Sequence, residues 1–202
     1  MPLTPKRAQM FYNDSMKVGI LAFHGDFAEH IEILRSLKHT PVEIRTLEDL
    51  KGIPKLIIPG GESTVMAAFL EMTGLAKEIQ KRVRKKNLSV FGTCAGAILL
   101  AKKATGKHTP NTLGLIDLTV DRNAYGTQLD SFAATIKAKG IKKPMNVSFI
   151  RAPRFSNVGR EARVLAEYQG SPILVEQGKV LVAAFHPEVR GETSLHEYFI
   201  SL

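Results

Sequence analysis

Apolar stretches alternate with segments of helical periodicity through the first half of the chain. The stretches at 18–23, 42–45 and 55–58 predict strands, and a further apolar strand is expected from Ser89. Helical segments are expected over 27–37, 65–70 and 75–86, with a short helical turn over 47–51. This strand–helix alternation predicts a parallel sheet with helices on both faces, in which ligands bind beyond the carboxyl ends of the strands.

The second half of the chain has a different pattern. Alternating positions predict strands at 115–120, 131–136 and 147–150, and three more at 164–168, 172–176 and 179–185. Short turns separate the last three, which indicates a hairpin-rich antiparallel extension of the sheet. A final helix is expected over 195–202, capped by Ser194. The expected fold class is therefore α/β: a three-layer sandwich with a mostly parallel central sheet and an antiparallel extension.

Composition is that of a globular domain. The 202 residues are 44% hydrophobic and 23% charged, and no apolar run approaches the roughly 20 residues that cross a bilayer. We expect one domain over 18–202, preceded by an extension over 1–17 that lacks the apolar core of a signal peptide. The single cysteine cannot form an intramolecular disulfide, so a cytoplasmic location is expected. No membrane partner is expected, since no apolar run is long enough to cross a bilayer.

The chain is strongly basic, with a formal net charge of +9. Such a charge fits nucleic acid, an acidic partner protein or a well-solvated surface. No aromatic-rich RNA motif and no Cys/His metal spacing accompanies it, so neither nucleic acid nor a metal is expected. The basic residues of segment 75–86 are interpreted as a solvated helix face.

The only cysteine lies in a strand–turn–helix pattern. The sequence Gly-Thr-Cys-Ala-Gly at 92–96 follows an apolar strand and precedes an apolar helical segment. Flanking glycines permit the sharp reversal of a nucleophile elbow, and the following helix presents free N–H groups and the positive end of its dipole to the sulfur. Cys94 is therefore a candidate nucleophile, although a buried structural cysteine between glycines would give the same pattern.

A histidine and a glutamate close the apolar stretch at 179–185. A cysteine nucleophile needs a base that takes its proton and a carboxylate that orients this base. His186 and Glu188, with one proline between them, supply both groups in the order Cys, His, Glu along the chain. The three residues predict a catalytic triad.

A double-glycine turn follows the strand at 55–58. The sequence Pro-Gly-Gly-Glu-Ser-Thr at 59–64 can turn N–H groups toward the crevice, which suits an oxyanion hole made with the N–H of Ala95. The alternative is an ordinary loop in which Ser63 or Thr64 caps the next helix. In the same way, Asp26 is expected to cap the helix over 27–37.

These motifs together resemble a known family. Gly-Thr-Cys-Ala-Gly and Phe-His-Pro-Glu are similar to the signatures of class I glutamine amidotransferases, which have a flavodoxin-like fold. The segments at 59–64, 121–126, 149–153 and 195–199 resemble, more narrowly, the glutaminase subunits of pyridoxal 5′-phosphate synthase. The likeness covers residues 18–202.

The resemblance implies that the protein hydrolyses L-glutamine to glutamate and ammonia. Cys94 would form a γ-glutamyl thioester, His186 would act as base and then acid, and Glu188 would orient His186. The other implied residues are those of the oxyanion hole, Gly61 and Ala95, and those that bind glutamine, Gly61, Glu62, Ser63, Arg122, Ile150 and Arg151. No metal or organic cofactor is implied.

The implied partner is a (β/α)8-barrel synthase subunit that receives the ammonia and makes pyridoxal 5′-phosphate. Two alternatives stay open: an amidotransferase that serves another synthase, and a subunit that only binds a partner. The chain also departs from the family pattern, because His24 replaces a usual glutamine and Thr127 a more frequent arginine. The charge of His24 changes near neutral pH, so we expect pH-dependent activity.

Overall fold

A seven-stranded sheet forms the centre of the protein. The computed structural model describes residues 15–122 and 131–202, and most of the expected extension lies outside them. The sheet has the order β10-β11-β12-β4-β3-β1-β2. Its strands are β1 (Lys17–Leu21), β2 (Thr40–Ile44), β3 (Lys55–Ile58), β4 (Ser89–Thr93), β10 (Arg163–Tyr168), β11 (Ser171–Gln177) and β12 (Val180–Ala183). Five neighbouring strands are parallel, in the order β12, β4, β3, β1 and β2. Strand β11 pairs antiparallel with both β12 and β10.

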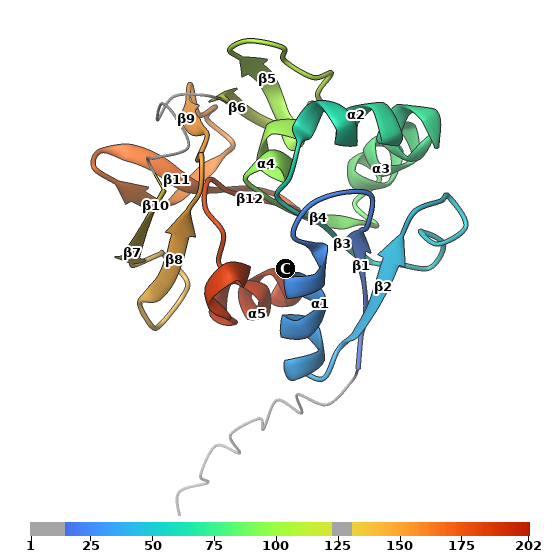
Figure 1. The fold of residues 1–202 in the computed structure, drawn as a ribbon, viewed down its shortest axis with the longest axis horizontal. Coiled ribbons are helices and arrows are strands. Elements are labelled where there is room, and N and C mark those ends of the chain that lie inside the picture. Colours follow the sequence, from blue (N-terminus) through green and yellow to red (C-terminus); the bar gives the residue numbers. More distant parts are fainter. Residues whose placement is uncertain (1–14, 123–130) are drawn as a thin grey trace, which may run out of the picture.

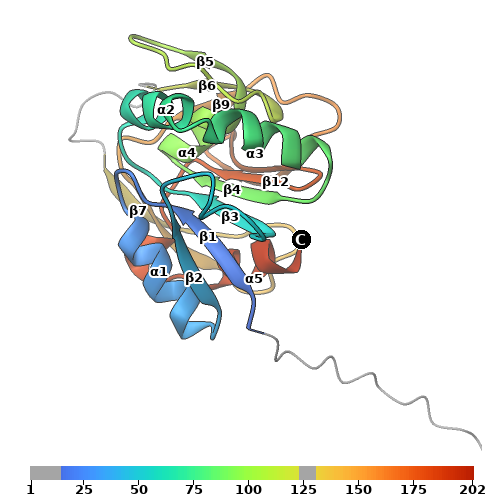
Figure 2. The same cartoon turned by 90° about the vertical axis from the view of Figure 1, so that its right-hand side faces the viewer.

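Helices cover both faces of this sheet (Figures 1 and 2). On one face lie α1 (Phe27–Ser36) and α5 (Ser194–Ser201). On the other lie α2 (Ser63–Met72), α3 (Leu75–Arg84) and α4 (Ala95–Leu100). The expected three-layer sandwich with an antiparallel extension is therefore confirmed.

Two smaller sheets flank the central one. The first has the order β5-β6-β9, with β5 (Ala101–Thr105), β6 (Ile116–Asp121) and β9 (Arg154–Ser156). The second pairs β7 (Phe132–Ile136) with β8 (Met145–Phe149). Neither β5 nor β9 was expected from the sequence, because β5 carries two adjacent lysines and β9 is only three residues long. Strands β6, β7 and β8 occur where the alternation predicts them, but they pair outside the central sheet.

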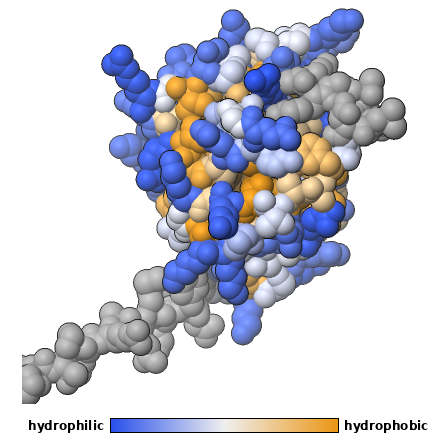
Figure 3. Space-filling view, turned by 90° about the vertical axis from the view of Figure 1, so that its left-hand side faces the viewer, coloured by the Kyte–Doolittle hydropathy of each residue, from blue (hydrophilic) through white to orange (hydrophobic). Residues whose placement is uncertain are grey.

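The core fills the space between the layers. Its largest fully buried side chains include five phenylalanines, at positions 91, 149, 155, 185 and 199. On the face shown in Figure 3, hydrophilic side chains project around places where hydrophobic residues reach the surface. Within the described ranges, no helix combines the length and the apolar character that crossing a membrane requires.

The observed helix caps differ in part from those expected. Asp26 occupies the N-cap position of α1, as expected, but its side chain makes no capping hydrogen bond. At α2 the capping residue is Glu62 rather than Ser63 or Thr64, because its carboxylate accepts hydrogen bonds from the N–H groups of Thr64 and Val65. At α5 the N-cap position is Thr193 rather than Ser194. At α2 and α5 the N-cap residue is therefore the residue directly before those expected to cap the helix.

Candidate active site

One pocket contains every residue that the sequence analysis assigned to glutamine and its oxyanion. The pocket has a volume of about 480 Å³ and opens at the carboxyl ends of β1, β3 and β4. Its walls are His24, Gly25, Asp26, Gly61, Glu62, Ser63, Cys94, Ala95, Ile98, Arg122, Ile150, Arg151 and His186. Glu188 lies behind His186, buried and outside the pocket wall.

Cys94 occupies a strained corner between β4 and α4. Its φ of 46° and ψ of −101° are unusual for a residue with a side chain. A methyl group on Gly96 would lie 2.0 Å from the carbonyl oxygen of Ile58, so only glycine permits this close approach of helix and strand. The backbone N–H of Cys94 donates to the carbonyl of Ala183 at 2.9 Å, which ties the corner to β12. The geometry is that of a nucleophile elbow.

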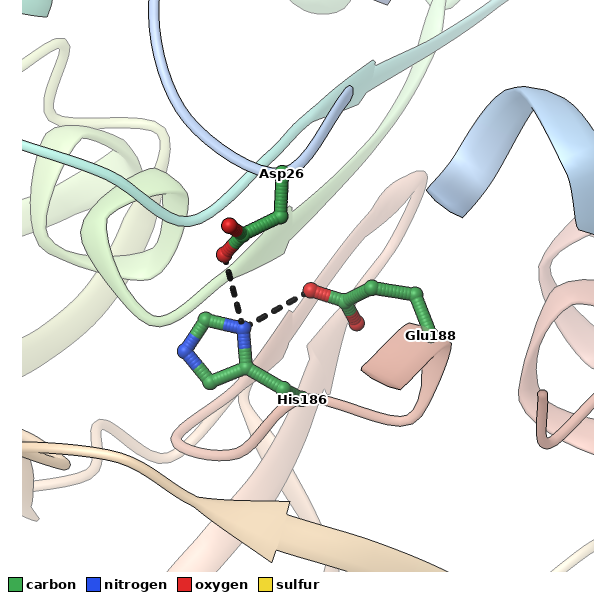
Figure 4. Close-up of side chains that lie close together, drawn as sticks. All are labelled: Asp26, His186 and Glu188. Atoms are coloured by element: carbon green, nitrogen blue, oxygen red, sulfur yellow. Dashed lines mark hydrogen bonds and ion pairs between the residues drawn. The ribbon is translucent and has the colours of Figure 1, made fainter. Parts of the chain in front are cut away.

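His186 is held beside this corner by β8. The backbones of His186 and Ser148 exchange two hydrogen bonds, of 2.8 and 3.1 Å, in an isolated antiparallel bridge. The imidazole Nδ1 lies 2.8 Å from Oε1 of Glu188, which begins a short 3-10 helix (Glu188–Arg190). Both side chains are almost wholly buried. Figure 4 shows that a second carboxylate, that of Asp26, approaches the same nitrogen at 3.4 Å.

Charge interactions in this group favour an imidazolium next to a carboxylate. Burial opposes the charged form of His186, but hydrogen bonds and charge interactions with the Cys94 sulfur and the Glu188 carboxylate outweigh burial and raise the pKa of His186 to about 11. Burial likewise opposes the Glu188 carboxylate, yet His30 and His186 hold its pKa well below the usual range. A proton held on His186 leaves Cys94 able to react as a thiolate.

The loop at 59–64 approaches both His24 and His186. A methyl group on Gly60 would lie 2.3 Å from Cε1 of His186, and Gly61 has a φ of +143° that only glycine adopts readily. Ser63 is buried, and its Oγ has no hydrogen-bond partner among the described residues. An unpartnered buried hydroxyl at a pocket wall is suited to hydrogen bonding a ligand.

Two arginines, Arg122 and Arg151, also line the pocket. The guanidinium of Arg122 lies 3.0 Å from Oε1 of Glu62 and also donates to the backbone carbonyl of His108. Glu62 therefore both caps α2 and fixes Arg122, a pairing that the sequence analysis did not contain. Arg151 is exposed and has a positive φ of 46°, and the carbonyl of the preceding Ile150 lies 3.9 Å from the Cys94 sulfur.

The two departures from the family pattern have different outcomes. Nδ1 of His24 lies 3.4 Å from the backbone nitrogen of Glu62 and accepts its hydrogen bond, so His24 contacts the loop of the expected oxyanion hole. Thr127 lies outside the described residues, as do residues 123–126 of the arginine-asparagine segment.

Local sequence reasoning did not find three side chains around the triad. Asp26 was expected only as a helix cap, but its side chain approaches His186. His30 and His196 are fully buried behind Glu188. A signal was available for His30, because it lies four residues before Leu34 and so shares the apolar face of α1. Asp26, His186 and Glu188 also form a group of metal-ligating type, with facing atoms within 4.8 Å, but their ion pairs account for this closeness.

An α/β sheet with a cysteine elbow and a following His–Glu pair defines the triad class of glutamine amidotransferases. The model of the SNO glutamine amidotransferase family matches residues 20–202. The chain belongs to this family.

Curated relatives and a solved structure agree with this assignment. The chain is 44% identical to the pyridoxal 5′-phosphate synthase subunit PdxT of Thermosipho africanus, over 93% of this chain and 98% of the relative. It is also 44% identical to the subunit of that name from Thermus thermophilus, over 92% and 96% of the two chains. A crystal structure of a glutamine amidotransferase superimposes with a TM-score of 0.87 at 43% identity and covers 91% of this chain and 97% of its own. The fold alone is shared with the PurLQS structure from Thermotoga maritima, at a TM-score of 0.65 and 15% identity.

Proposed function

We propose that this protein is the glutaminase subunit of a pyridoxal 5′-phosphate synthase, with Cys94, His186 and Glu188 as its catalytic triad. The observation that carries the proposal is the convergence of the Cys94 elbow and the buried His186–Glu188 pair on one pocket. Similarity to the PdxT relatives over nearly the whole chain supports the choice of pathway.

The first half of the reaction transfers the γ-glutamyl group of glutamine to the enzyme. The Cys94 thiolate attacks the side-chain amide carbon of glutamine, and the new C–S bond places negative charge on the amide oxygen. The N–H groups of Gly61 and Ala95 stabilise this oxyanion. The His186 imidazolium then gives its proton to the amide nitrogen, the C–N bond breaks and ammonia leaves, so that a γ-glutamyl thioester and a neutral His186 remain.

The second half releases glutamate. Neutral His186 takes a proton from water, whose oxygen attacks the thioester carbonyl. The C–S bond then breaks, glutamic acid leaves and loses its proton to solvent, and the thiolate–imidazolium pair is restored. Glu188 orients the imidazole in both halves and stabilises its charged form.

The remaining pocket residues bind the amino-acid end of glutamine. The planar guanidinium of Arg122 fits the two oxygens of a free α-carboxylate, and the Glu62 carboxylate offers the charge opposite to an α-ammonium group. Ser63 Oγ is free to hydrogen bond the ligand, and Ile150 and Arg151 close the wall beside the sulfur. Exchange of Arg122 for lysine should raise the KM for glutamine more than it lowers kcat.

The proposed partner is a (β/α)8-barrel synthase subunit that receives the ammonia. An exposed apolar stripe on α2 supports docking at the mouth of the pocket: Val65, Phe69 and Met72 are 40%, 38% and 81% exposed. Phe69 stacks on Phe23, beside His24 of the pocket, with ring centroids 4.9 Å apart. A reactive cysteine is kept reduced in the cytoplasm, where we expect the reaction to take place.

A second candidate is an amidotransferase subunit that feeds ammonia to another synthase. The fold is shared with such proteins at low identity, and the triad does not discriminate between them. The degree of identity to the PdxT relatives favours the first candidate.

Glutamate release from L-glutamine tests the proposal, measured with and without a pyridoxal 5′-phosphate synthase barrel subunit. We expect turnover that rises sharply with the barrel subunit and vanishes in Cys94→Ala. Turnover that needs Cys94 but ignores the barrel subunit would assign the protein to another synthase. No turnover under either condition would favour a subunit that only binds its partner.

A further inference from the structure

Two buried histidines lie on the far side of Glu188 from His186, and one of them contacts the Glu188 carboxylate. His30 on α1 and His196 on α5 are both fully buried between their helices and the central sheet. Nε2 of His30 lies 3.4 Å from Oε1 of Glu188, the same oxygen that lies 2.8 Å from Nδ1 of His186. Nδ1 of His30 lies 2.8 Å from Nε2 of His196. The ring of Phe91 packs edge-on against both imidazoles.

One nitrogen of His30 carries an N–H that points to Glu188. Its Nδ1 contacts Nε2 of His196, and burial lowers the pKa of His196 to about 3. Its Nε2 faces Oε1 of an ionised carboxylate, which can only accept a hydrogen bond, so Nε2 of His30 is the donor to Glu188. The hydroxyl of Thr93, the residue before Cys94, lies 3.4 Å from the same nitrogen.

The Glu188 carboxylate needs this second donor at one stage of the reaction. While His186 is an imidazolium, the pair is an ion pair between two buried groups. After His186 has given its proton to ammonia, Glu188 faces a neutral ring and becomes a buried carboxylate without a charged partner beside it. A carboxylate in that position stays ionised only if other hydrogen bonds stabilise it.

We propose that His30 is a positioning residue of the glutaminase reaction: through its Nε2–H it holds Glu188 ionised and oriented while the γ-glutamyl thioester is present. The proposal rests on the proposed function, because it concerns the thioester stage of that reaction. It assigns the largest effect of His30 to deacylation, in which neutral His186 takes the proton of water.

Two substitutions at position 30 separate the donor from the bulk of the side chain. His30→Met fills much of the space and has no N–H, whereas His30→Gln keeps an amide N–H near the place of Nε2. Each variant is assayed with the barrel subunit for kcat and KM, and its thermal midpoint is recorded. Acid quenching during turnover, followed by intact-mass measurement, gives the fraction of Cys94 held as thioester.

We expect His30→Met to lower kcat roughly 10- to 100-fold, the effect of losing a hydrogen bond to a charged group, without raising KM. The thioester fraction should increase, and His30→Gln should recover most of the loss. A folded His30→Met variant with wild-type kcat would overturn the proposal, as would an equal loss in both variants or a loss without thioester accumulation. Failure of the proposed function is distinguishable, since wild-type turnover would then be absent or independent of Cys94.

Discussion

At the scale of single residues, the site depends on buried and half-buried charges that stabilise one another. Oε1 of Glu188 faces His186 and His30, and the guanidinium of Arg122 pairs with the carboxylate that caps α2. Such pairs contribute net stability only while both partners keep their charge or their hydrogen bonds. The stability of the protein should therefore depend on the ionisation of these groups.

The first prediction concerns Glu188→Gln. The pKa of Glu188 is lowered from 4.5 in the folded protein, so its contribution to stability is fully present above about pH 4.5 and is lost as the pH falls toward the folded pKa. We expect the variant to be about 1–3 kcal/mol less stable than the wild type at pH 7. Urea unfolding at a series of pH values should show this gap narrow as the pH falls below 4.5. A gap that does not change with pH would contradict the assigned charge.

The second prediction concerns His24, which accepts a hydrogen bond from the N–H of Glu62. Loss of this acceptor should release the loop of the oxyanion hole, so His24→Ala should lower kcat/KM for glutamine. A glutamine side chain also offers an acceptor oxygen, so His24→Gln should keep most of the activity. Equal losses in the two variants, measured as glutamate release, would rule out this role of His24.

At the scale of elements, the elbow depends on the close approach of β4, α4 and β3. A methyl group on Gly96 would lie 2.0 Å from the backbone oxygen of Ile58, and one on Gly92 would lie 2.6 Å from the backbone carbon of Gly96. Neither neighbour is the end of a flexible side chain that could move aside. The position of Cys94 is therefore determined by backbone packing.

Gly96→Ala tests this packing. We expect a loss of about 2–3 kcal/mol, a fall in the thermal midpoint of about 4–12 °C, and a lower kcat because the sulfur is displaced. Gly178→Ala is a control without a close contact: its φ is +58°, but its methyl group would meet no atom within 4 Å. The control should cost about 1 kcal/mol and leave kcat unchanged. Similar losses of stability and of kcat in the two variants would contradict the role of the close contact at Gly96.

At the scale of the whole molecule, the pocket mouth and the apolar stripe of α2 lie side by side. Val65, Phe69 and Met72 are spaced four and three residues apart and so share one helix face. An exposed apolar face next to a site whose product is ammonia suits a partner that takes up this product.

Met72→Glu tests this surface. A charge at the most exposed position of the stripe should raise at least about tenfold the concentration of barrel subunit that gives half-maximal turnover, because a carboxylate would be buried on docking. The turnover without the barrel subunit should not change. Lys85→Glu, at the end of α3 away from the stripe, is the control for added negative charge. An equal effect of both substitutions would indicate a general electrostatic attraction instead of docking on α2.

Local sequence signals predicted most of the elements of the fold. Period-two and period-3.6 patterns placed the core strands and helices to within a few residues, because the residues on their buried faces are apolar and recur at regular spacing in the sequence. The strand–turn–helix around Cys94 and the His–Pro–Glu sequence were recognisable for the same reason, since each occupies one short segment. The fold class could be inferred once these elements were in order, because parallel strands joined by helices pack in few ways.

Which side chains meet can be told only from the folded chain. The pairing of β6 with β9, the ion pair of Arg122 with Glu62, and the contact of Asp26 with His186 join segments far apart in the chain. Asp26 lies at the N-cap position of α1, but its side chain approaches His186 and makes no capping hydrogen bond. His30 and His196 are separated by 166 residues, and their contact exists only because α1 and α5 pack on the same face of the sheet. The elements and the reactive groups can be recognised from short segments of the sequence. The electrostatic surroundings of those groups require the folded chain, since burial and charge act through space.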